Sequence, residues 1–322
     1  MCTAISLHGR HALSGRTLDL EYSFGERAVI IPRKFKHKFR RACLPAGSYA
    51  IMGIAHIAGG VPLFYDAMNE NGLYAAALNF PRRAVYSDYK EGVINLASFE
   101  VIPYILSSSK SIDDAEDMFR RVNIVGDSFS PDLPATPLHW FFSDGARSIV
   151  CEPLGEGLKI YGNPSGVMTN SPELPYHILN LSNYMRCSPE PPKNSLCPNL
   201  ALENYSRGLG GIGLPGDYSS ESRFVRAAFA KTHTVCESSG EISSFFHIMD
   251  TVSVPRGCIL TDEGLPVSTV YTSCADLSSG EYFFTTYENR RVRKISFKNR
   301  ELDSSLPTIY PIYSAEDIYE YE

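Results

Sequence analysis

The sequence predicts an α+β fold in which two sheets lie between layers of helices. Groups of short apolar runs, with the length and spacing typical of strands, are separated by groups of helical patterns. Turn pairs such as Asn71-Gly72 and Asp144-Gly145 divide the strand-like runs. Because strands and helices are grouped along the chain, we expect two sheets that pack on each other and are covered by helices.

The first part of the chain consists of strand-like runs. Residues 3–8 and 13–20 are apolar segments on either side of the sequence His8-Gly9-Arg10-His11, which indicates two strands joined by a turn. Further strands are predicted at 28–32, 49–57, 63–67 and 73–78.

Two helices are predicted next. Residues 96–106 are apolar at near-helical spacing, and Ser111 precedes a second helix that extends to about residue 122. A serine at the N-cap and the carboxylates of Asp113 and Asp114 in the first turn would stabilise the start of that helix. The strands that follow are predicted at 138–143, 148–152, 158–161 and 166–169.

The second half of the chain combines helices, a long loop and closing strands. Residues 186–218 contain five prolines and, from Gly208 onward, five glycines, which predicts a long loop. The strand pattern resumes afterwards, so we expect one domain over residues 1–322, with a solvated acidic tail at 313–322. Helices are predicted at 176–184, 221–232 and 242–252, and strands at 268–272, 282–287 and 292–297.

Composition and charge argue against several classes of protein. The 322 residues are 43% hydrophobic and carry a formal net charge of −6, which disfavours nucleic acid as a partner. No apolar run approaches the roughly 18–20 residues of a membrane span, and the N-terminal region lacks the apolar core of a signal peptide. The eight cysteines form no CxxC pair, so we expect reduced thiols in a cytoplasmic protein that has no membrane partner.

Two further patterns do not indicate a cofactor or a metal ion. Residues 208–213 match GxGxxG, but they follow a proline-rich loop instead of a strand, and Pro215 blocks a helix start there. The eight histidines include no HExxH pair, and none combines with cysteine at zinc-binding spacing. We therefore expect no cofactor and no metal.

The N-terminus gives the strongest indication of catalysis. Cys2 stands directly behind the initiator, and its small side chain favours removal of Met1. The residue would then carry a thiol and a free α-amine, whose reference pKa values of about 8.5 and about 7.7–8.0 nearly balance proton exchange between them. A nucleophile and its base would thus share one α-carbon. Arg16 and Asp19 follow, a cation that can lower the pKa of the thiol and a carboxylate that can orient the amine.

Three other polar residues stand at tight turns. Asn79 ends a predicted strand in LNFP, and Asn170 does the same in MTNSP. Arg223 lies in the first turn of a predicted helix, where the helix dipole disfavours a cation, which indicates another role for its guanidinium. Asparagine is also a common turn former, so each asparagine segment alone is compatible with an ordinary turn.

Together these segments resemble the choloylglycine hydrolase family, which contains bile salt hydrolases and penicillin V acylases. The resemblance implies an N-terminal nucleophile hydrolase with a four-layer αββα sandwich and a homotetrameric assembly. The similar segments, in family order, are MCTAI (1–5), GRTLDL (15–20), NENGL (69–73), LNFP (78–81), LHWFFSD (138–144), VMTNSP (167–172), GLPGD (213–217) and SRFVRA (222–227).

The resemblance also implies roles for six residues. Cys2 matches the nucleophile, with its freed amine as the base, and Arg16 and Asp19 match the residues that flank and orient it. Asn170 and the backbone N–H of Asn79 match the oxyanion hole, and Arg223 matches the second arginine of the site. Amide hydrolysis passes through a tetrahedral oxyanion, and each donor aimed at that oxyanion contributes roughly 3–4 kcal/mol.

The resemblance leaves more than one substrate class open. Asn79 resembles the bile salt hydrolases, since penicillin V acylases tend to carry tyrosine there, whereas the IGLPGD and SVPRG stretches are shared with the acylases. We expect hydrolysis of glycine- or taurine-conjugated bile salts, with penicillin V as the alternative substrate and an inactive binding homologue as a third reading. A bile salt would need an apolar groove. Met52, Ile57, Ala58, Phe64 and Phe129 lie in segments where the resemblance places the family's pocket loops, although each is equally compatible with the hydrophobic core.

Overall fold

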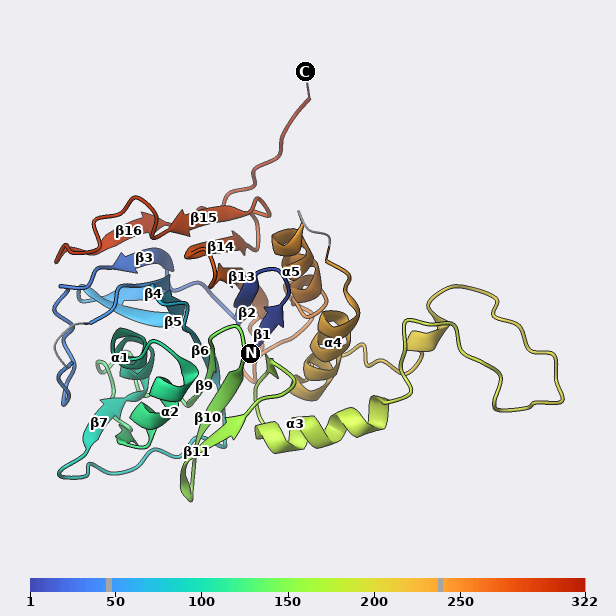
Figure 1. Cartoon of the computed structure of the whole chain (residues 1–322), viewed down its shortest axis with the longest axis horizontal. Coiled ribbons are helices and arrows are strands. Elements are labelled where there is room, and N and C mark those ends of the chain that lie inside the picture. Colours follow the sequence, from blue (N-terminus) through green and yellow to red (C-terminus); the bar gives the residue numbers. More distant parts are fainter. Residues whose placement is uncertain (45–47, 237–239, 322) are drawn as a thin grey trace.

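The computed structural model describes residues 1–44, 48–236 and 240–321, and it confirms the predicted α+β fold. Two large antiparallel sheets are stacked, with helices on their outer faces (Figure 1). Both sheets combine strands from distant parts of the chain.

The six-stranded sheet has the order β12-β1-β2-β13-β14-β15 and brings the N-terminal strand into its interior. The eight-stranded sheet has the order β11-β10-β9-β6-β5-β4-β3-β16. The strands of the first sheet are β1 (Cys2–His8), β2 (Ala12–Leu20), β12 (Val167–Met168), β13 (Ser268–Asp276), β14 (Glu281–Thr286) and β15 (Arg293–Ser296). Those of the second are β3 (Arg27–Ile31), β4 (Ile51–Ala58), β5 (Val61–Asn69), β6 (Tyr74–Asn79), β9 (Leu138–Ser143), β10 (Ser148–Leu154), β11 (Gly157–Gly162) and β16 (Thr308–Pro311).

The helices form the outer layers. α1 (Val101–Ser108) and α2 (Ile112–Phe119) pack on the eight-stranded sheet, while α4 (Ser220–His233) and α5 (Glu241–Asp250) pack on the six-stranded sheet (Figure 1). The short helix α3 (Leu174–Asn180) lies beside α4. As expected, Ser111 caps α2, because its Oγ accepts the N–H of Asp114 at 3.2 Å.

The core is divided by the eight-stranded sheet. Along β9, Phe141 faces the six-stranded sheet, whereas Trp140 and Phe142 face α1 and α2. Alternate side chains of a strand point to opposite faces, so the nearly continuous apolar run of β9 serves two cores at once.

One predicted helix is shorter than expected. We expected residues 96–106 to be helical, but Ile94–Ala97 form strand β7, which pairs in parallel with β8 (Val122–Val125). A 3₁₀ turn (Ser98–Glu100) then leads into α1. The side chain of Asn95, which interrupts the apolar run, hydrogen-bonds Asn123 on the neighbouring strand, and this tertiary pairing overrides the local pattern.

Residues 186–218 leave the body of the protein as an arm, drawn in yellow in Figure 1, and contain only a short 3₁₀ helix (Leu209–Gly211). Across the ranges 1–44, 48–236 and 240–321, no helix has the length and apolar character needed to span a bilayer.

Candidate active site

Cys2 is the first residue of β1, where it pairs with Leu18 of β2 and is only 3% exposed. Its backbone N–H donates to Oδ1 of Asn170 at 2.9 Å. Met1 precedes it, and the amino group of Met1 donates to the carbonyl oxygen of Asp19 at 2.6 Å. If Met1 were removed, the α-amine of Cys2 would therefore lie against the side chain of Asn170.

The guanidinium of Arg16 is fully buried beside the thiol. Its Nη2 donates to Sγ of Cys2, and its Nη1 donates to the carbonyl oxygens of Tyr65, at 3.1 Å, and Ala77, at 2.5 Å. The carbonyl of Tyr65 is available because of a β-bulge, in which Tyr65 stands unpaired between the paired residues on either side. The bulge thus supplies an acceptor for Arg16.

Close approach of two strands also shapes this region. A Cβ atom at Gly15 would lie 2.0 Å from the carbonyl oxygen of Ser273, so only glycine allows β2 and β13 to come this close. The N–H of the next residue, Arg16, donates to Oγ of Ser273 at 3.2 Å, which fixes the backbone from which the guanidinium extends.

A buried carboxylate, Asp66, lies behind Arg16 between the sheets. Burial alone would lower the pKa of Arg16, but the attraction of Cys2, Tyr271 and Asp66 outweighs burial and raises its pKa above the usual value. Arg16 therefore stays charged next to the thiol. Burial also raises the pKa of Asp66, against the opposing effect of Arg16. Asp66 accepts hydrogen bonds from the hydroxyl groups of Tyr74, Tyr271, Ser273 and Tyr282.

Asp19 is buried near the end of β2. Its Oδ1 accepts a hydrogen bond from Oγ1 of Thr269 at 2.7 Å, and its Oδ2 accepts one from Oγ1 of Thr17 at 3.3 Å. A second β-bulge, between Thr269 and Tyr271 on β13, lies directly opposite Asp19. Bulges re-aim side chains, and this one brings the Thr269 hydroxyl to the carboxylate.

Arg223 approaches Cys2 from the first turn of α4. Its Nη1 donates to the carbonyl oxygen of Cys2 at 2.5 Å, and its Nη2 donates to Oδ1 of Asn170 at 2.7 Å. Burial lowers the pKa of Arg223, and the attraction of Asp19 and Cys2 partly offsets that effect. These contacts explain why a cation occupies the unfavourable N-terminal turn of a helix.

Asn170 and Asn79 meet across the two sheets. Nδ2 of Asn170 donates to the carbonyl oxygen of Asn79 at 2.7 Å. The N–H of Phe80 donates to the carbonyl oxygen of Pro137, the residue before β9, so the N–H and C=O of Asn79 point away from β9. The pairing of β6 with β5 ends at Ala76, so the N–H of Asn79 lies beyond the end of that ladder. The structure thus brings all six predicted polar residues into one cluster, in which Asn79 is partly exposed and the other five are buried.

An apolar cavity of about 450 Å³ adjoins this cluster, and Cys2, Arg16 and Asn79 form part of its wall. Phe64 and Phe129, two of the residues expected at a substrate pocket, also line it. Apolar residues that the sequence did not single out make up much of the remaining lining: Leu18, Leu20, Tyr22, Phe24, Leu63, Phe99, Ile102, Leu133 and Leu138. Glu21, His56 and Asp132 are also part of it.

The other three expected pocket residues do not line this cavity. Met52 is fully buried in the core between the sheets, and Ile57 packs against the core under α1. Ala58 is the last residue of β4. Strand alternation could have identified Leu18 and Leu20, because they share one face of β2 with Arg16.

No cluster of three or more metal-ligating side chains is present in the part of the chain that the structure describes. The arrangement contains a thiol, a permanent cation beside it, backbone and amide donors, and an apolar cavity. Such a set can perform nucleophilic attack on a carbonyl group and stabilise the resulting oxyanion.

Comparison with known sequences gives a consistent result. The profile of the family described as linear amide C–N hydrolases, choloylglycine hydrolase family, matches residues 2–310. The chain is 41% identical over 321 residues to the bile salt hydrolase/transferase of Lactiplantibacillus plantarum, with 99% of both chains covered. It is 35% identical over 313 residues to that of Clostridium perfringens, with 95% of both covered.

Comparison with solved structures extends this result to the fold. The C2A mutant of the conjugated bile acid hydrolase from Clostridium perfringens is similar with a TM-score of 0.92 and 33% identity over 100% of both chains. The penicillin V acylase of Agrobacterium tumefaciens has a TM-score of 0.75 at 22% identity, covering 96% of this chain and 90% of the acylase, which is a likeness of fold alone. The expected sandwich of two sheets and outer helices is thereby confirmed.

Proposed function

The chain belongs to the choloylglycine hydrolase family of linear amide C–N hydrolases, and we propose that it hydrolyses the amide bond of bile salts conjugated to glycine or taurine. Relatives that carry the name bile salt hydrolase/transferase cover almost the entire chain. The structural observation that carries the proposal is the contact of the Cys2 thiol with Arg16 in the wall of an apolar cavity. Such a cavity suits a steroid body whose amide lies beside the nucleophile.

In the proposed mechanism, removal of Met1 frees the α-amine of Cys2, which takes the proton of the thiol. The thiolate, stabilised by Arg16, attacks the carbonyl carbon of the substrate amide. The carbonyl oxygen becomes an oxyanion, which accepts hydrogen bonds from the N–H of Asn79 and from the Nδ2–H of Asn170 that Asn79 does not use. The α-ammonium then protonates the leaving nitrogen, the C–N bond breaks, and a thioester remains.

Water completes the proposed cycle. The α-amine takes a proton from the water molecule, whose oxygen attacks the thioester, and the thiolate leaves as the bile acid is released. An amine in place of water would give acyl transfer. Arg223 holds both the carbonyl of Cys2 and Oδ1 of Asn170, so it fixes the base relative to the oxyanion donor. We assign the orientation of the freed amine to Asp19, whose backbone already flanks Met1.

A second candidate function is hydrolysis of penicillin V. The acylase fold is similar, but the residue at the end of β6 is Asn79, where acylases of the family tend to carry tyrosine. A third candidate is an inactive binding homologue, against which the intact cluster of Cys2, Arg16 and Asn170 argues.

A direct substrate comparison tests these alternatives. The purified protein is incubated with glycine- and taurine-conjugated bile salts and, separately, with penicillin V, and the released amino acid or phenoxyacetate is quantified. We expect kcat/KM to be at least about tenfold higher for the bile salts, the size of discrimination that apolar pockets commonly provide. Preference for penicillin V would support the acylase. Release from neither substrate, by protein whose loss of Met1 is verified by mass spectrometry, would support the binding homologue.

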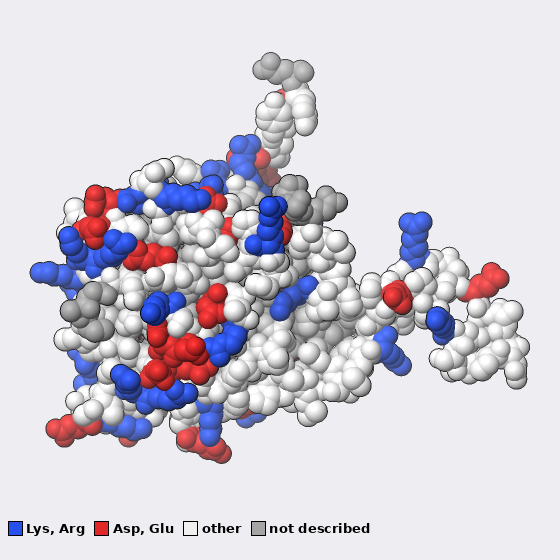
Figure 2. All heavy atoms as spheres, viewed as in Figure 1, with Lys and Arg blue, Asp and Glu red and all other residues white. Residues whose placement is uncertain are grey.

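We further propose a homotetramer in which the arm of residues 186–218 packs on other copies of the chain. The side chains of Leu196 and Tyr205 are each 86% exposed, and Leu200 is 56% exposed. Figure 2 shows charges of both signs interspersed over the body, whereas mostly uncharged atoms lie at the far end of the arm. Exposed apolar side chains of this kind mark interaction surfaces. Light scattering should give the mass of a tetramer, and deletion of residues 190–206 should reduce it; an unchanged mass after the deletion would exclude this role of the arm.

The cysteines support a cytoplasmic location. All eight are free thiols, and Cys151 and Cys274 are fully buried in the core. Free thiols are typical of proteins in reducing compartments. We therefore propose the cytoplasm, which cell fractionation followed by immunoblotting would test.

A further inference from the structure

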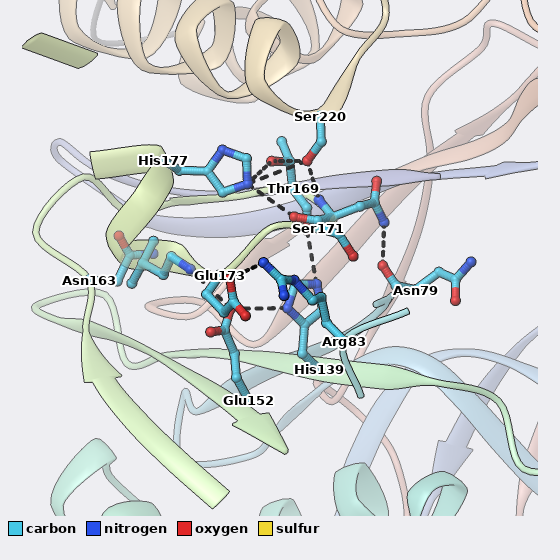
Figure 3. A network of polar contacts seen from close by, with 12 residues as sticks. Asn79, Arg83, His139, Glu152, Asn163, Thr169, Ser171, Glu173, His177 and Ser220 are labelled. Atoms are coloured by element: carbon cyan, nitrogen blue, oxygen red, sulfur yellow. Dashed lines mark hydrogen bonds and ion pairs between the residues drawn. The ribbon is translucent and has the colours of Figure 1, made fainter. Parts of the chain in front are cut away.

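A closed ring of buried polar contacts includes the carbonyl oxygens of Thr169 and Asn170; Figure 3 labels its members Glu152, His139, Thr169 and His177. It runs from Glu152 on β10 through His139 on β9 to the carbonyl oxygen of Thr169. From the next carbonyl oxygen, that of Asn170, it returns through His177 on α3 to Glu152, which accepts the first N–H of that helix. These three side chains are at most 2% exposed and do not line the cavity. We propose that His139, His177 and Glu152 are positioning residues that hold the amide of Asn170 where the oxyanion develops. This inference rests on the oxyanion role proposed above for Asn170.

His177 and Ser220 fix the peptide groups of Asn170 itself. Nε2 of His177 lies 3.0 Å from the carbonyl oxygen of Asn170, and Oγ of Ser220 accepts the N–H of Asn170 at 2.9 Å. Because a carbonyl oxygen only accepts, His177 must carry a proton on Nε2. Burial lowers the pKa of His177, which keeps the ring neutral. Ser220 in turn donates to Oγ1 of Thr169 at 2.9 Å.

His139 fixes the preceding peptide group from the other side. Its Nε2 donates to the carbonyl oxygen of Thr169 at 3.0 Å, so Nδ1 of the neutral ring is an acceptor. Nδ1 lies 3.3 Å from Oε1 of Glu152. Burial lowers the pKa of His139 to about 3 and raises the pKa of Glu152 to about 7. Below about pH 7, Glu152 is therefore protonated and donates a hydrogen bond to Nδ1 of the neutral His139 ring, so the two side chains do not form an ion pair.

The ring closes through the start of α3. Oε1 of Glu152 accepts the backbone N–H of Leu174, the first residue of that helix, at 3.2 Å. The carboxyl group that supports His139 thus also fixes the helix that carries His177. A displacement of Glu152, His139 or His177 would therefore displace the other two side chains and the backbone of Asn170.

Both histidine rings also stack on aromatic residues next to the site. The ring of His139 stacks on Phe80, which directly follows the second oxyanion donor, with 4.1 Å between centroids. The ring of His177 stacks on Phe224, which directly follows the second arginine, with 4.8 Å between centroids. The two histidines therefore connect three segments that supply groups to the reaction.

The contribution of His139, His177 and Glu152 is to fix the position of the Asn170 amide. Apolar side chains would fill the same space without burying three titratable groups, which is costly unless each finds a partner. A displacement of about 1 Å in a catalytic group can lower the rate about 100-fold. His139 and His177 donate to the carbonyl oxygens of Thr169 and Asn170, and these two hydrogen bonds resist a displacement of Asn170.

The test separates oxyanion stabilisation from formation of the thiolate. His177→Phe and His139→Phe keep a stacked ring but remove the Nε2 donor, whereas His177→Gln and His139→Gln restore a donor at a similar distance. We expect the phenylalanine variants to lose about 10- to 100-fold in kcat with KM changed less than about threefold. Alkylation of Cys2 by iodoacetamide should stay within about twofold, because that reaction needs the thiolate but forms no oxyanion. The glutamine variants should recover most of kcat.

A matched control is Glu173→Gln, which should leave kcat unchanged. It removes an ion pair of 3.2 Å between Glu173 and Arg83, which lies beside the ring (Figure 3). If the phenylalanine variants do not fold, Ser220→Ala provides the same test, with an expected loss of about 5- to 10-fold in kcat and unchanged alkylation. The inference is overturned by unchanged kcat, by equal losses of turnover and alkylation, or by glutamine variants as slow as the phenylalanine ones. If the wild-type protein hydrolysed neither bile salts nor penicillin V, the proposed function would be refuted. That result can be told apart from failure of the positioning role, which is judged by comparing variants with an active wild type.

Discussion

Replacement of Cys2 by serine is expected to lower kcat on conjugated bile salts by at least about 1,000-fold while the protein remains folded. The physical reason is the contact of Sγ with Arg16, which stabilises a thiolate. A hydroxyl group has a much higher pKa than a thiol, so an α-amine near neutrality cannot deprotonate it to a comparable extent. The rate of glycine or taurine release, measured beside a thermal unfolding curve, checks both parts of the expectation.

The control for this change is Cys258→Ser, because Cys258 is an exposed thiol and its replacement should leave the rate within about twofold. Mass spectrometry should show that Met1 is absent from both variants, since serine is also small enough to allow trimming. A serine variant that keeps more than about a tenth of the wild-type rate would mean that Cys2 is not the nucleophile.

Replacement of Asn170 by aspartate has the second largest expected effect, a loss of about 100- to 1,000-fold in kcat. The variant keeps Oδ1, which accepts from Cys2 and Arg223, but it loses the Nδ2 donor and places an anion beside the developing oxyanion. Folding should be retained, because the carboxylate gains attraction to Arg223. Steady-state kinetics should show the loss in kcat, with KM changed little.

Asn170→Ala should show a similar loss in kcat but also a lower melting temperature, since it removes the acceptor of Nη2 of Arg223 and the donor to the carbonyl oxygen of Asn79. Asn183→Ala, on the surface after α3, serves as a control and should match the wild type. If the aspartate variant retained wild-type kcat, the oxyanion role of Asn170 would be refuted.

Much of the fold was predictable because strands and helices leave local patterns. The strand at 138–143 and the capped helix after Ser111 follow directly from apolar runs, turn residues and an N-cap. Strand β7 was not predictable in this way, because the run that contains Leu96 fits a helix as well as a strand. Its pairing with β8 decides between them, and that pairing is a tertiary contact.

The candidate site was predictable only in part. Its polar residues could be found because they stand at turns and termini. Local turn patterns do not reveal a contact between distant residues such as Cys2 and Asn170. His139 and His177 carry no spacing signal, because each acts through a backbone carbonyl rather than through another motif residue. The cavity lining depends on how strands and loops converge in space, which explains why Met52 lies in the core instead.

The position of Met1 has a consequence for how active molecules arise. Its amino group donates a hydrogen bond to the carbonyl oxygen of Asp19, its carbonyl oxygen accepts one from the N–H of Asp19, and the residue lines the cavity. An aminopeptidase binds an extended chain end, so these two hydrogen bonds must be absent while Met1 is removed. The mechanism proposed here therefore favours trimming before β1 has paired with β2, during synthesis of the chain.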